Sequence, residues 1–166
     1  HQMIYDIVIL TDSRYEKPEK TDWYIEQILL EDGLVQKALE EKGLKVIRKS
    51  WDAKDFDWTQ CRYAIFRSTW DYFDRFGEFF SWFEKTRKVL EFINCPEIIY
   101  WNLDKHYLND LKQSNINIPP TIFLEKGEQQ SLNALFEKTE WTKAVLKPAI
   151  AGAARETFLI KKEEYL

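Results

Sequence analysis

An uninterrupted apolar run, YDIVILT at residues 5–11, constrains the fold more than any other part of the sequence. A run of this length that ends in a polar, turn-like segment is typical of a strand buried on both faces of a sheet. Apolar positions then recur at roughly helical spacing over residues 22–42, and Gly43 is placed as a C-terminal cap. Two more strand-like runs follow at residues 44–49 and 62–68. Strands that alternate with helices predict an α/β unit with a mainly parallel sheet.

The rest of the chain adds further elements. The first helix has one possible interruption, near residues 32–33. Asp74 is a candidate cap for a long amphipathic helix that runs to about Asn94, and Pro96 closes this part of the chain. After Asn102 the expected elements are shorter: a helix at about 103–113, an edge-like strand at 119–124, a helix near 132–138, and strands at 143–147 and 157–162.

These elements divide the chain into two domains. Residues 3–101 are expected to form an α/β domain, with an open, mainly parallel sheet flanked by helices. Residues 102–166 begin a second, α+β domain, and they supply too few strands and helices to close a core. We therefore expect an N-terminal fragment of a longer protein. In the first domain, ligands should bind at the carboxyl ends of the strands.

Composition excludes several functional classes. The chain has 7 Trp, 8 Tyr and 11 Phe, and 45% of its residues are hydrophobic, which is enough apolar area for a folded core. The net charge is only −4, with acids and bases interspersed, so binding to nucleic acid or to an anionic membrane is not expected. No apolar run approaches the roughly 20 residues of a membrane span, and no secretory leader is visible. We expect a cytoplasmic protein.

A lysine stands directly before a run of small residues in VLKPAIAGAARE, residues 145–156. Lys147, at the end of an expected strand, would supply a positive charge, and the small residues would let the backbone approach phosphate oxygens closely. The alternative is that Lys147 is a solvent-exposed charge and that the alanines only begin a turn.

A second lysine, Lys105, lies in YWNLDKHYLNDL, in the first turn of an expected helix that Asn102 or Asp104 could cap. The helix dipole disfavours a cation at that end. An anion that bridges Lys105 and Lys147 would compensate, because each charged hydrogen bond contributes about 1.5–3 kcal/mol. The alternative is a surface lysine that pairs with Asp104 or Asn109.

A third group follows the strand at residues 62–68. Arg67 can bind a carboxylate through two N–H groups, Ser68 and Thr69 can donate hydroxyl hydrogen bonds, and Trp70 can form the wall of a pocket. Ser68 and Asp71 are equally suited to turn or capping roles, with the aromatic residues packed in the core.

Other chemistries find no support in the sequence. It contains no P-loop, no glycine-rich dinucleotide-binding turn and no cysteine and histidine cluster with metal-ligand spacing. His106 has no serine or cysteine partner motif. No catalytic residue and no metal ligand is therefore assigned.

Four ordered segments, RSTWDYFDRFGEFFSWF, PEIIYWNLDKHYL, NIPPT and VLKPAIAGAARET, resemble the bacterial ATP-grasp proteins related to prokaryotic glutathione synthetase, particularly the cycloserine-synthetase-like branch. The resemblance covers almost the whole chain from Met3 onward. It implies a pre-ATP-grasp domain at residues 3–101 and the truncated start of an ATP-grasp nucleotide-binding domain at residues 102–166.

The resemblance also implies a function. Such enzymes are ligases that use ATP and Mg²⁺ to join a small carboxylate to an amine or a thiol through an acyl phosphate. The family's two phosphate-binding lysines map onto Lys105 and Lys147, and the small-residue loop resembles a lid over the triphosphate. The residues expected to bind ATP are Lys105, Lys147, Ala151, Gly152, Ala153 and Arg155. The residues expected to line the substrate side are Arg67, Ser68, Thr69, Trp70 and Asp71.

This sequence departs from the family pattern in two ways. The loop has one glycine, Gly152, where relatives tend to have more, and the family's magnesium ligands lie in a C-terminal part that has no counterpart here. We therefore expect the 166-residue chain alone to be inactive. A noncatalytic module that binds a small ligand or a partner remains the alternative function, and a homodimer is one possible assembly.

Overall fold

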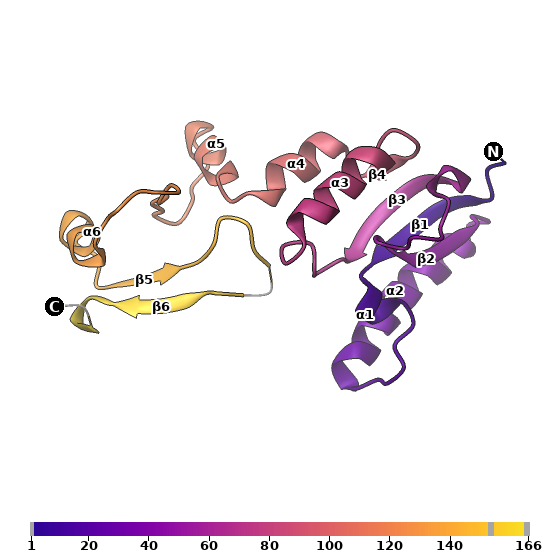
Figure 1. The fold of residues 1–166 in the computed structure, drawn as a ribbon, viewed down its shortest axis with the longest axis horizontal. Helices are drawn as coiled ribbons and strands as arrows, with labels where there is room; N and C mark the ends of the chain where they lie inside the picture. Colours follow the sequence, from indigo (N-terminus) through magenta and orange to yellow (C-terminus); the bar gives the residue numbers. More distant parts are fainter. Residues whose placement is uncertain (1, 153–154, 165–166) are drawn as a thin grey trace. The chain divides into compact units, whose positions relative to one another are not determined.

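The computed structural model describes residues 2–152 and 155–164. The chain forms two compact units, and the boundary between them in the sequence lies after Ile99. The first unit contains a four-stranded parallel sheet with the strand order β2-β1-β3-β4 (Figure 1). Its strands are β1 (Tyr5–Thr11), β2 (Val46–Ser50), β3 (Cys61–Ser68) and β4 (Glu91–Ile93). The predicted α/β fold with a parallel sheet is confirmed.

Helices connect these strands, and they are α1 (Ser13–Glu16), α2 (Trp23–Glu40), η1 (Trp58–Gln60) and α3 (Phe76–Thr86). The connection through α2 leads from β1 to β2, and the connection through α3 leads from β3 to β4, in the opposite direction along the sheet. Right-handed crossovers therefore place α2 and α3 on opposite faces of the sheet (Figure 1).

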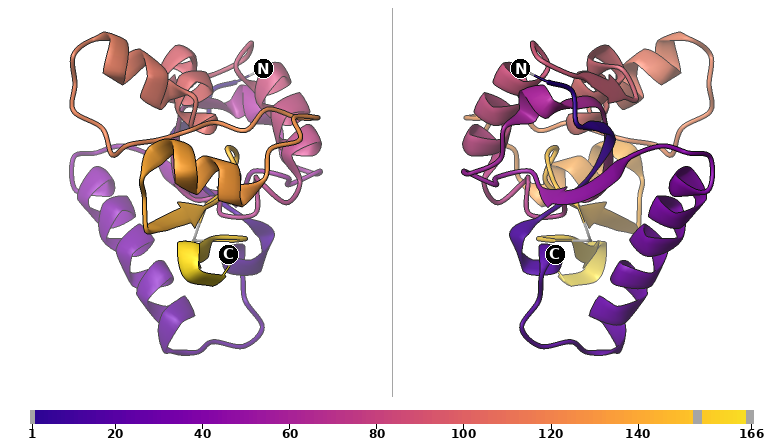
Figure 2. Two further views of the ribbon diagram at one scale, coloured as in Figure 1. Left: turned by 90° about the vertical axis from the view of Figure 1, so that its left-hand side faces the viewer. Right: turned by 90° about the vertical axis from the view of Figure 1, so that its right-hand side faces the viewer.

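The helix α2 shows how local sequence determines its ends. The side chain of Asp22 caps it by accepting a hydrogen bond from the Ile25 N–H at 2.8 Å, and Gly43 follows it with a φ of 83° that favours glycine. The interruption expected near residues 32–33 is absent, and Figure 2 shows one unbroken helix. Asp32 is compatible with the helix because its carboxylate is buried against arginine side chains of the sheet rather than bonded to its own backbone.

The core of the first unit lies around β1 and under α3. Residues 7–10 of β1 are buried, as expected for a central parallel strand. Under α3, Phe66 of β3 stacks on Phe92 of β4 with ring centroids 5.2 Å apart, and Phe83 of α3 contacts Phe92 at 4.7 Å. This aromatic packing holds α3 against the strands β3 and β4.

The predicted helix from Asp74 to Asn94 is wrong in length. The helix α3 ends at Thr86, and residues 91–93 form β4 instead. Ile93 was placed on the helical apolar stripe in the sequence, but as the last residue of β4 it pairs with Ile65 of β3. Asp74 is also not the cap, since α3 begins after Arg75 and has no side-chain cap.

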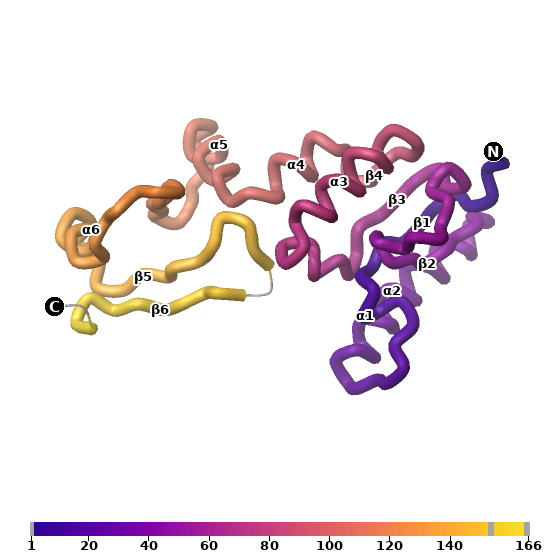
Figure 3. Tube along the Cα trace, viewed as in Figure 1, coloured from indigo at the N-terminus to yellow at the C-terminus, as the bar shows by residue number. Residues whose placement is uncertain are grey.

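The second unit contains helices and a two-stranded sheet. Its elements are α4 (Pro96–Leu103), which begins before the unit boundary, α5 (Tyr107–Gln113), α6 (Leu132–Thr139), β5 (Lys143–Leu146), β6 (Phe158–Lys161) and η2 (Lys162–Glu164). The strands β5 and β6 are antiparallel neighbours, as the trace in Figure 3 shows. Val145 and Leu159 face each other across this pair and are 55% and 60% exposed.

Two predictions for the second unit need correction. The helix expected at 103–113 is divided, because α4 starts at Pro96, a favourable first helical position for proline, and α5 starts only at Tyr107. The segment at residues 119–124 is not a strand, since Pro119 and Pro120 lack the N–H groups that a ladder requires. Within the described residues, no helix is long and apolar enough to cross a membrane.

Candidate functional site

Lys105 lies in the turn between α4 and α5, and two kinds of bond tie it to the loop after β5. Its backbone N–H donates to the carbonyl of Ala149 at 2.9 Å. Its Nζ donates to the carbonyls of Ala149 at 3.3 Å and Ala151 at 3.0 Å. The ammonium group is therefore held at a defined place beside the small-residue loop.

Lys147 follows β5 and lines the same cleft as Lys105, a cavity of about 820 Å³ within the second unit. Burial lowers the pKa of Lys105, and the nearby charge of Lys147 lowers it further. Among the described residues, neither ammonium group has a carboxylate partner within 4.0 Å. The two positive charges thus meet at one cleft without a neutralising ion pair.

The walls of the cleft are largely apolar. They come from α6, from the strands β5 and β6, and from the segment before residue 125. Phe136 of α6 and Ile160 of β6 are buried there, and the ring of Phe123 stacks on His106 at 4.1 Å. Two cations beside apolar walls can bind a molecule that has both a polyanionic part and a flat or apolar part.

His106 fixes the turn that carries Lys105. Its Nδ1 lies 2.5 Å from an oxygen of Asp104, and its Nε2 lies 2.9 Å from an oxygen of Glu125. The hydrogen bond with Asp104 raises the pKa of His106, and the bond with Glu125 adds to this effect. Asp104 also accepts a hydrogen bond from the His106 backbone N–H at 2.9 Å. Its carboxylate therefore orders this turn, and it neither caps α5 nor pairs with Lys105.

The predicted lid residues lie at the same loop. Ala151 and Gly152 are half-buried, and the carbonyl of Gly152 accepts a hydrogen bond from the Arg155 N–H at 3.0 Å. The guanidinium of Arg155 is 3.7 Å from Glu156. Ala153 lies outside the described residues.

The predicted substrate residues lie at the carboxyl end of β3, where a bulge sets Ser68 opposite Thr11. The Nε of Arg67 donates to Asp32 of α2 at 3.3 Å, and the Ser68 hydroxyl donates to the same carboxylate at 2.9 Å. Arg48 of β2 also donates to it, at 2.8 Å. Asp32 therefore joins three elements, and the Ser68 hydroxyl is used inside the protein, whereas Arg67 uses its Nε there and places its Nη2 3.6 Å from exposed Glu31.

The last three predicted substrate residues differ from one another in exposure. Thr69 and Asp71 are buried, and Asp71 accepts hydrogen bonds from the indole N–H of Trp51 at 2.8 Å and from Arg75 at 3.2 Å. Trp70 is 37% exposed and packs edge-on against Tyr15, with ring centroids 5.9 Å apart. Trp70 and Arg67 thus keep surface that a ligand can contact.

Sequence reasoning missed three residues at this same edge. Asp12 and Arg14 follow β1, and Trp51 follows β2, so the rule that selected the residues after β3 applies equally to them. Asp12 and Trp51 are fully buried, whereas Arg14 reaches the surface. Within residues 2–152 and 155–164, no group of three or more His, Cys, Asp or Glu side chains is placed to hold a metal ion.

Comparison with known proteins gives three matches. Residues 7–94 match the family model described as the D-cycloserine synthetase DcsG N-terminal domain. The cycloserine biosynthesis protein DcsG of Streptomyces lavendulae is 31% identical over 77 residues, which is 46% of this chain and 26% of that protein. A crystal structure of D-cycloserine synthetase DcsG matches with a TM-score of 0.79 and 22% identity, over 95% of this chain and 50% of that chain. The chain therefore spans about half the length of the solved relative, and this last match concerns the fold.

Proposed function

We propose that the chain is the N-terminal part of an ATP-dependent ligase of the ATP-grasp superfamily. The chain belongs to the family of the D-cycloserine synthetase DcsG N-terminal domain, whose model matches residues 7–94. The reaction is the joining of a small carboxylate to an amine or a thiol, as in glutathione-synthetase-like enzymes. ATP supplies the phosphoryl group that activates the carboxylate as an acyl phosphate. The relatives' printed names, a synthetase and a biosynthesis protein, support a biosynthetic enzyme.

One observation carries the proposal: Lys105 and Lys147 line the same cleft, 42 positions apart in the sequence. Burial of the Lys105 ammonium group lowers its pKa, and repulsion from the nearby Lys147 lowers it further. A triphosphate would relieve both effects, because each charged hydrogen bond contributes about 1.5–3 kcal/mol. The apolar walls of the cleft suit the base of a nucleotide.

The remaining residues take supporting roles in this proposal. The small-residue loop, which includes Ala151 and Gly152, covers the phosphates in this proposal, and Arg155 binds a phosphate or a substrate carboxylate. In the first unit, Arg67 and Trp70 contact the substrate, and the buried side chains beside them hold the strand end in place. Mg²⁺ would neutralise phosphate charge, and no described residue of this chain is assigned to it.

The experiment is ATP turnover by the full-length protein, with a panel of amino acids and small carboxylates as acids and with amines or thiols as acceptors. We expect ADP release that depends on both substrates, together with an amide or thioester product. A phosphorylated product that no acceptor consumes would indicate a kinase instead. No turnover with any pair, combined with ligand binding that does not depend on Lys105 and Lys147, would favour a noncatalytic module.

A further inference from the structure

Between β1 and β3 the direction of the chain's crossovers along the sheet reverses. From β1 the chain crosses to β2 on one side, and from β3 it crosses to β4 on the other side. In open α/β sheets this switch point forms a crevice at the carboxyl ends of the strands, where ligands bind. Asp12 stands there directly after β1, and its backbone N–H donates to the carbonyl of Ser68 at the end of β3, at 3.0 Å.

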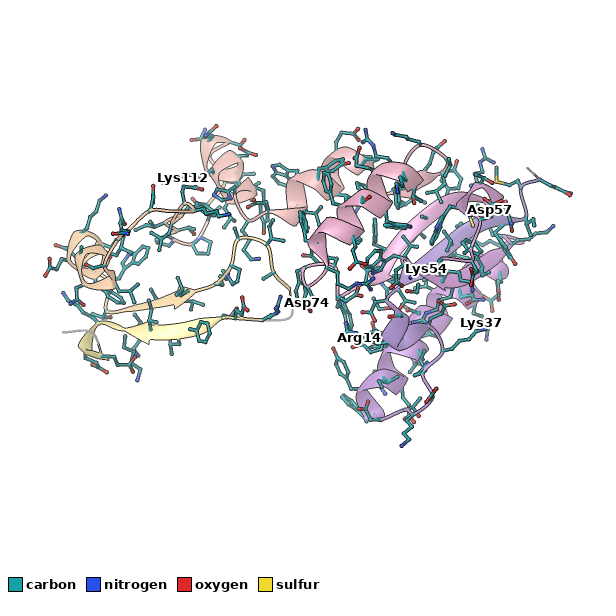
Figure 4. All side chains as sticks on the ribbon, in the orientation of Figure 1. Arg14, Lys37, Lys54, Asp57, Asp74 and Lys112 are labelled. Atoms are coloured by element: carbon teal, nitrogen blue, oxygen red, sulfur yellow. The ribbon has the colours of Figure 1, made fainter. Side chains whose placement is uncertain are left out.

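Asp12 holds the side chain of Arg14 in one orientation. The Nε of Arg14 donates to one carboxylate oxygen of Asp12 at 3.0 Å, and its Nη2 donates to the other at 2.6 Å. Asp12 is fully buried, whereas the Arg14 side chain keeps 54% of its surface exposed. Figure 4 labels Arg14, a residue of α1, at this end of the sheet. The arginine is thus anchored from within and presented to solvent.

The geometry of the guanidinium leaves a second pair of donors. The edge formed by Nε and Nη2 is used by Asp12, which leaves the adjacent edge, where one Nη1 hydrogen and the second Nη2 hydrogen form a parallel pair. Within the described part of the chain, these hydrogens donate to no acceptor. Two parallel N–H groups at this spacing match the two oxygens of a carboxylate.

Aromatic rings stand beside this pair of donors. The guanidinium of Arg14 lies 5.0 Å from the centroid of the Tyr15 ring, and Tyr15 in turn packs against Trp70. Tyr24 of α2 approaches Trp70 from the other side, with centroids 6.3 Å apart. Asp71, which also acts electrostatically on Arg14, is paired with Arg75, so it repels an incoming anion only weakly. The rings can bury the carbon part of a small molecule, or accept an ammonium group over a ring face.

We infer that Arg14, anchored by Asp12 and flanked by Tyr15 and Trp70, binds the carboxylate of a small amino-acid-like substrate. The inference rests on the proposed ligase function for the identity of the ligand as a substrate. The binding itself needs neither ATP nor the cleft of the second unit. The proposed substrate-binding surface therefore includes Arg14 and Tyr15, which follow β1, in addition to the residues that follow β3.

The test is an NMR titration of the ¹⁵N-labelled chain with D-serine and L-serine, and with the methyl ester of each as a probe that lacks the carboxylate. We expect at least one of the two acids to shift the amide signals of residues 12–15 and the indole signal of Trp70, and the esters to leave the Arg14 guanidinium signals unchanged. Equal shifts with acid and ester would overturn the inference, as would the absence of shifts with both acids.

Variants locate the effect on the guanidinium. Arg14→Lys retains a positive charge next to buried Asp12, so the chain stays folded, but it removes the second donor pair and should weaken binding of the acid at least tenfold. Arg62→Gln is the matched control, because Arg62 is exposed near the opposite end of β3 and lies over Tyr63 at 5.2 Å. Unchanged binding by Arg14→Lys would overturn the inference, as would an equal loss in Arg62→Gln.

The outcomes also separate this inference from the proposed function. ATP binding by the full-length protein tests the nucleotide site of the ligase proposal and does not require Arg14. If ATP binds and the amino acids do not bind, the ligase proposal stands and the role of Arg14 is wrong. If the amino acids bind through Arg14 and ATP does not bind, the carboxylate site stands and the ligase proposal is wrong.

Discussion

The two units differ in whether the charged side chains at their candidate sites have ion-pair partners. At the sheet edge of the first unit, buried Asp32 is surrounded by Arg48, Arg67 and Ser68, so each charge has an internal partner. In the cleft of the second unit, Lys105 donates to carbonyl groups, and Lys147 stands near it with no carboxylate partner in the described part of the chain. Neutralised charges stabilise a fold, whereas uncompensated charges that converge on one cleft indicate a place for an anion.

The largest expected effect breaks the network of the first unit. Asp32→Ala leaves two arginines and a buried hydroxyl without their shared acceptor, and breaking a buried ion pair in this way costs about 3–5 kcal/mol. Urea unfolding followed by tryptophan fluorescence should show this loss. Glu31→Ala is the control, since Glu31 is exposed, pairs with Arg67 only at the surface at 3.6 Å, and should change the unfolding free energy by less than about 1 kcal/mol. Equal, small effects of the two variants would contradict the structural role of Asp32.

A smaller effect is expected for Ser68→Ala. The buried hydroxyl donates to Asp32 at 2.9 Å, and its oxygen lies 2.7 Å from the Thr11 hydroxyl, so its removal should cost about 1–3 kcal/mol of unfolding free energy. Ser81→Ala, on the exposed side of α3, is the control and should change stability by less than about 0.5 kcal/mol. A stability unchanged by Ser68→Ala would mean that its hydroxyl is available to a ligand after all.

The smallest stability effect concerns pH and the second unit. Asp104 and Glu125 raise the pKa of His106 above its ordinary value of 6.5, so protonated His106 stabilises the fold. This contribution is fully present below about pH 6.5 and is lost as the pH rises through the higher folded-state pKa. Thermal unfolding should therefore show a melting temperature that falls over this window, and His106→Gln should flatten the fall. A profile of the same slope in both proteins would show that His106 does not hold the turn.

The sequence predicts the first unit better than the second, for physical reasons. Apolar runs such as residues 5–11 favour a buried strand, because they are short and end at polar, turn-like residues. The end of α3 was ambiguous, since Ile93 was counted on a helical stripe but belongs to a three-residue strand, and only the pairing of that strand with β3 decides between the two. The shift from α4 to α5 was also hidden, because the turn between them depends on side-chain bonds of Asp104 and His106.

The candidate sites, too, could be predicted from the sequence only in part. The order of motifs predicted that Lys105 and Lys147 belong to one site, and the structure places both at one cleft. The partners of Arg67 and Ser68 were not predictable, because Asp32 lies about 35 residues earlier on a helix and becomes their neighbour only through the crossover. Arg14 was passed over because a short polar segment after a strand resembles an ordinary turn in sequence.

The most direct test of the central claim is calorimetric titration of ATP into the full-length protein and its variants Lys105→Ala, Lys147→Ala and the double variant. Lys112→Ala, on α5 and outside the cleft, is the control (Figure 4). If the two lysines hold one triphosphate, each single variant should weaken ATP binding about 10-fold to 100-fold, which corresponds to ~1.5–3 kcal/mol, and the control should not. ATP affinity that is unchanged in the double variant would contradict the account.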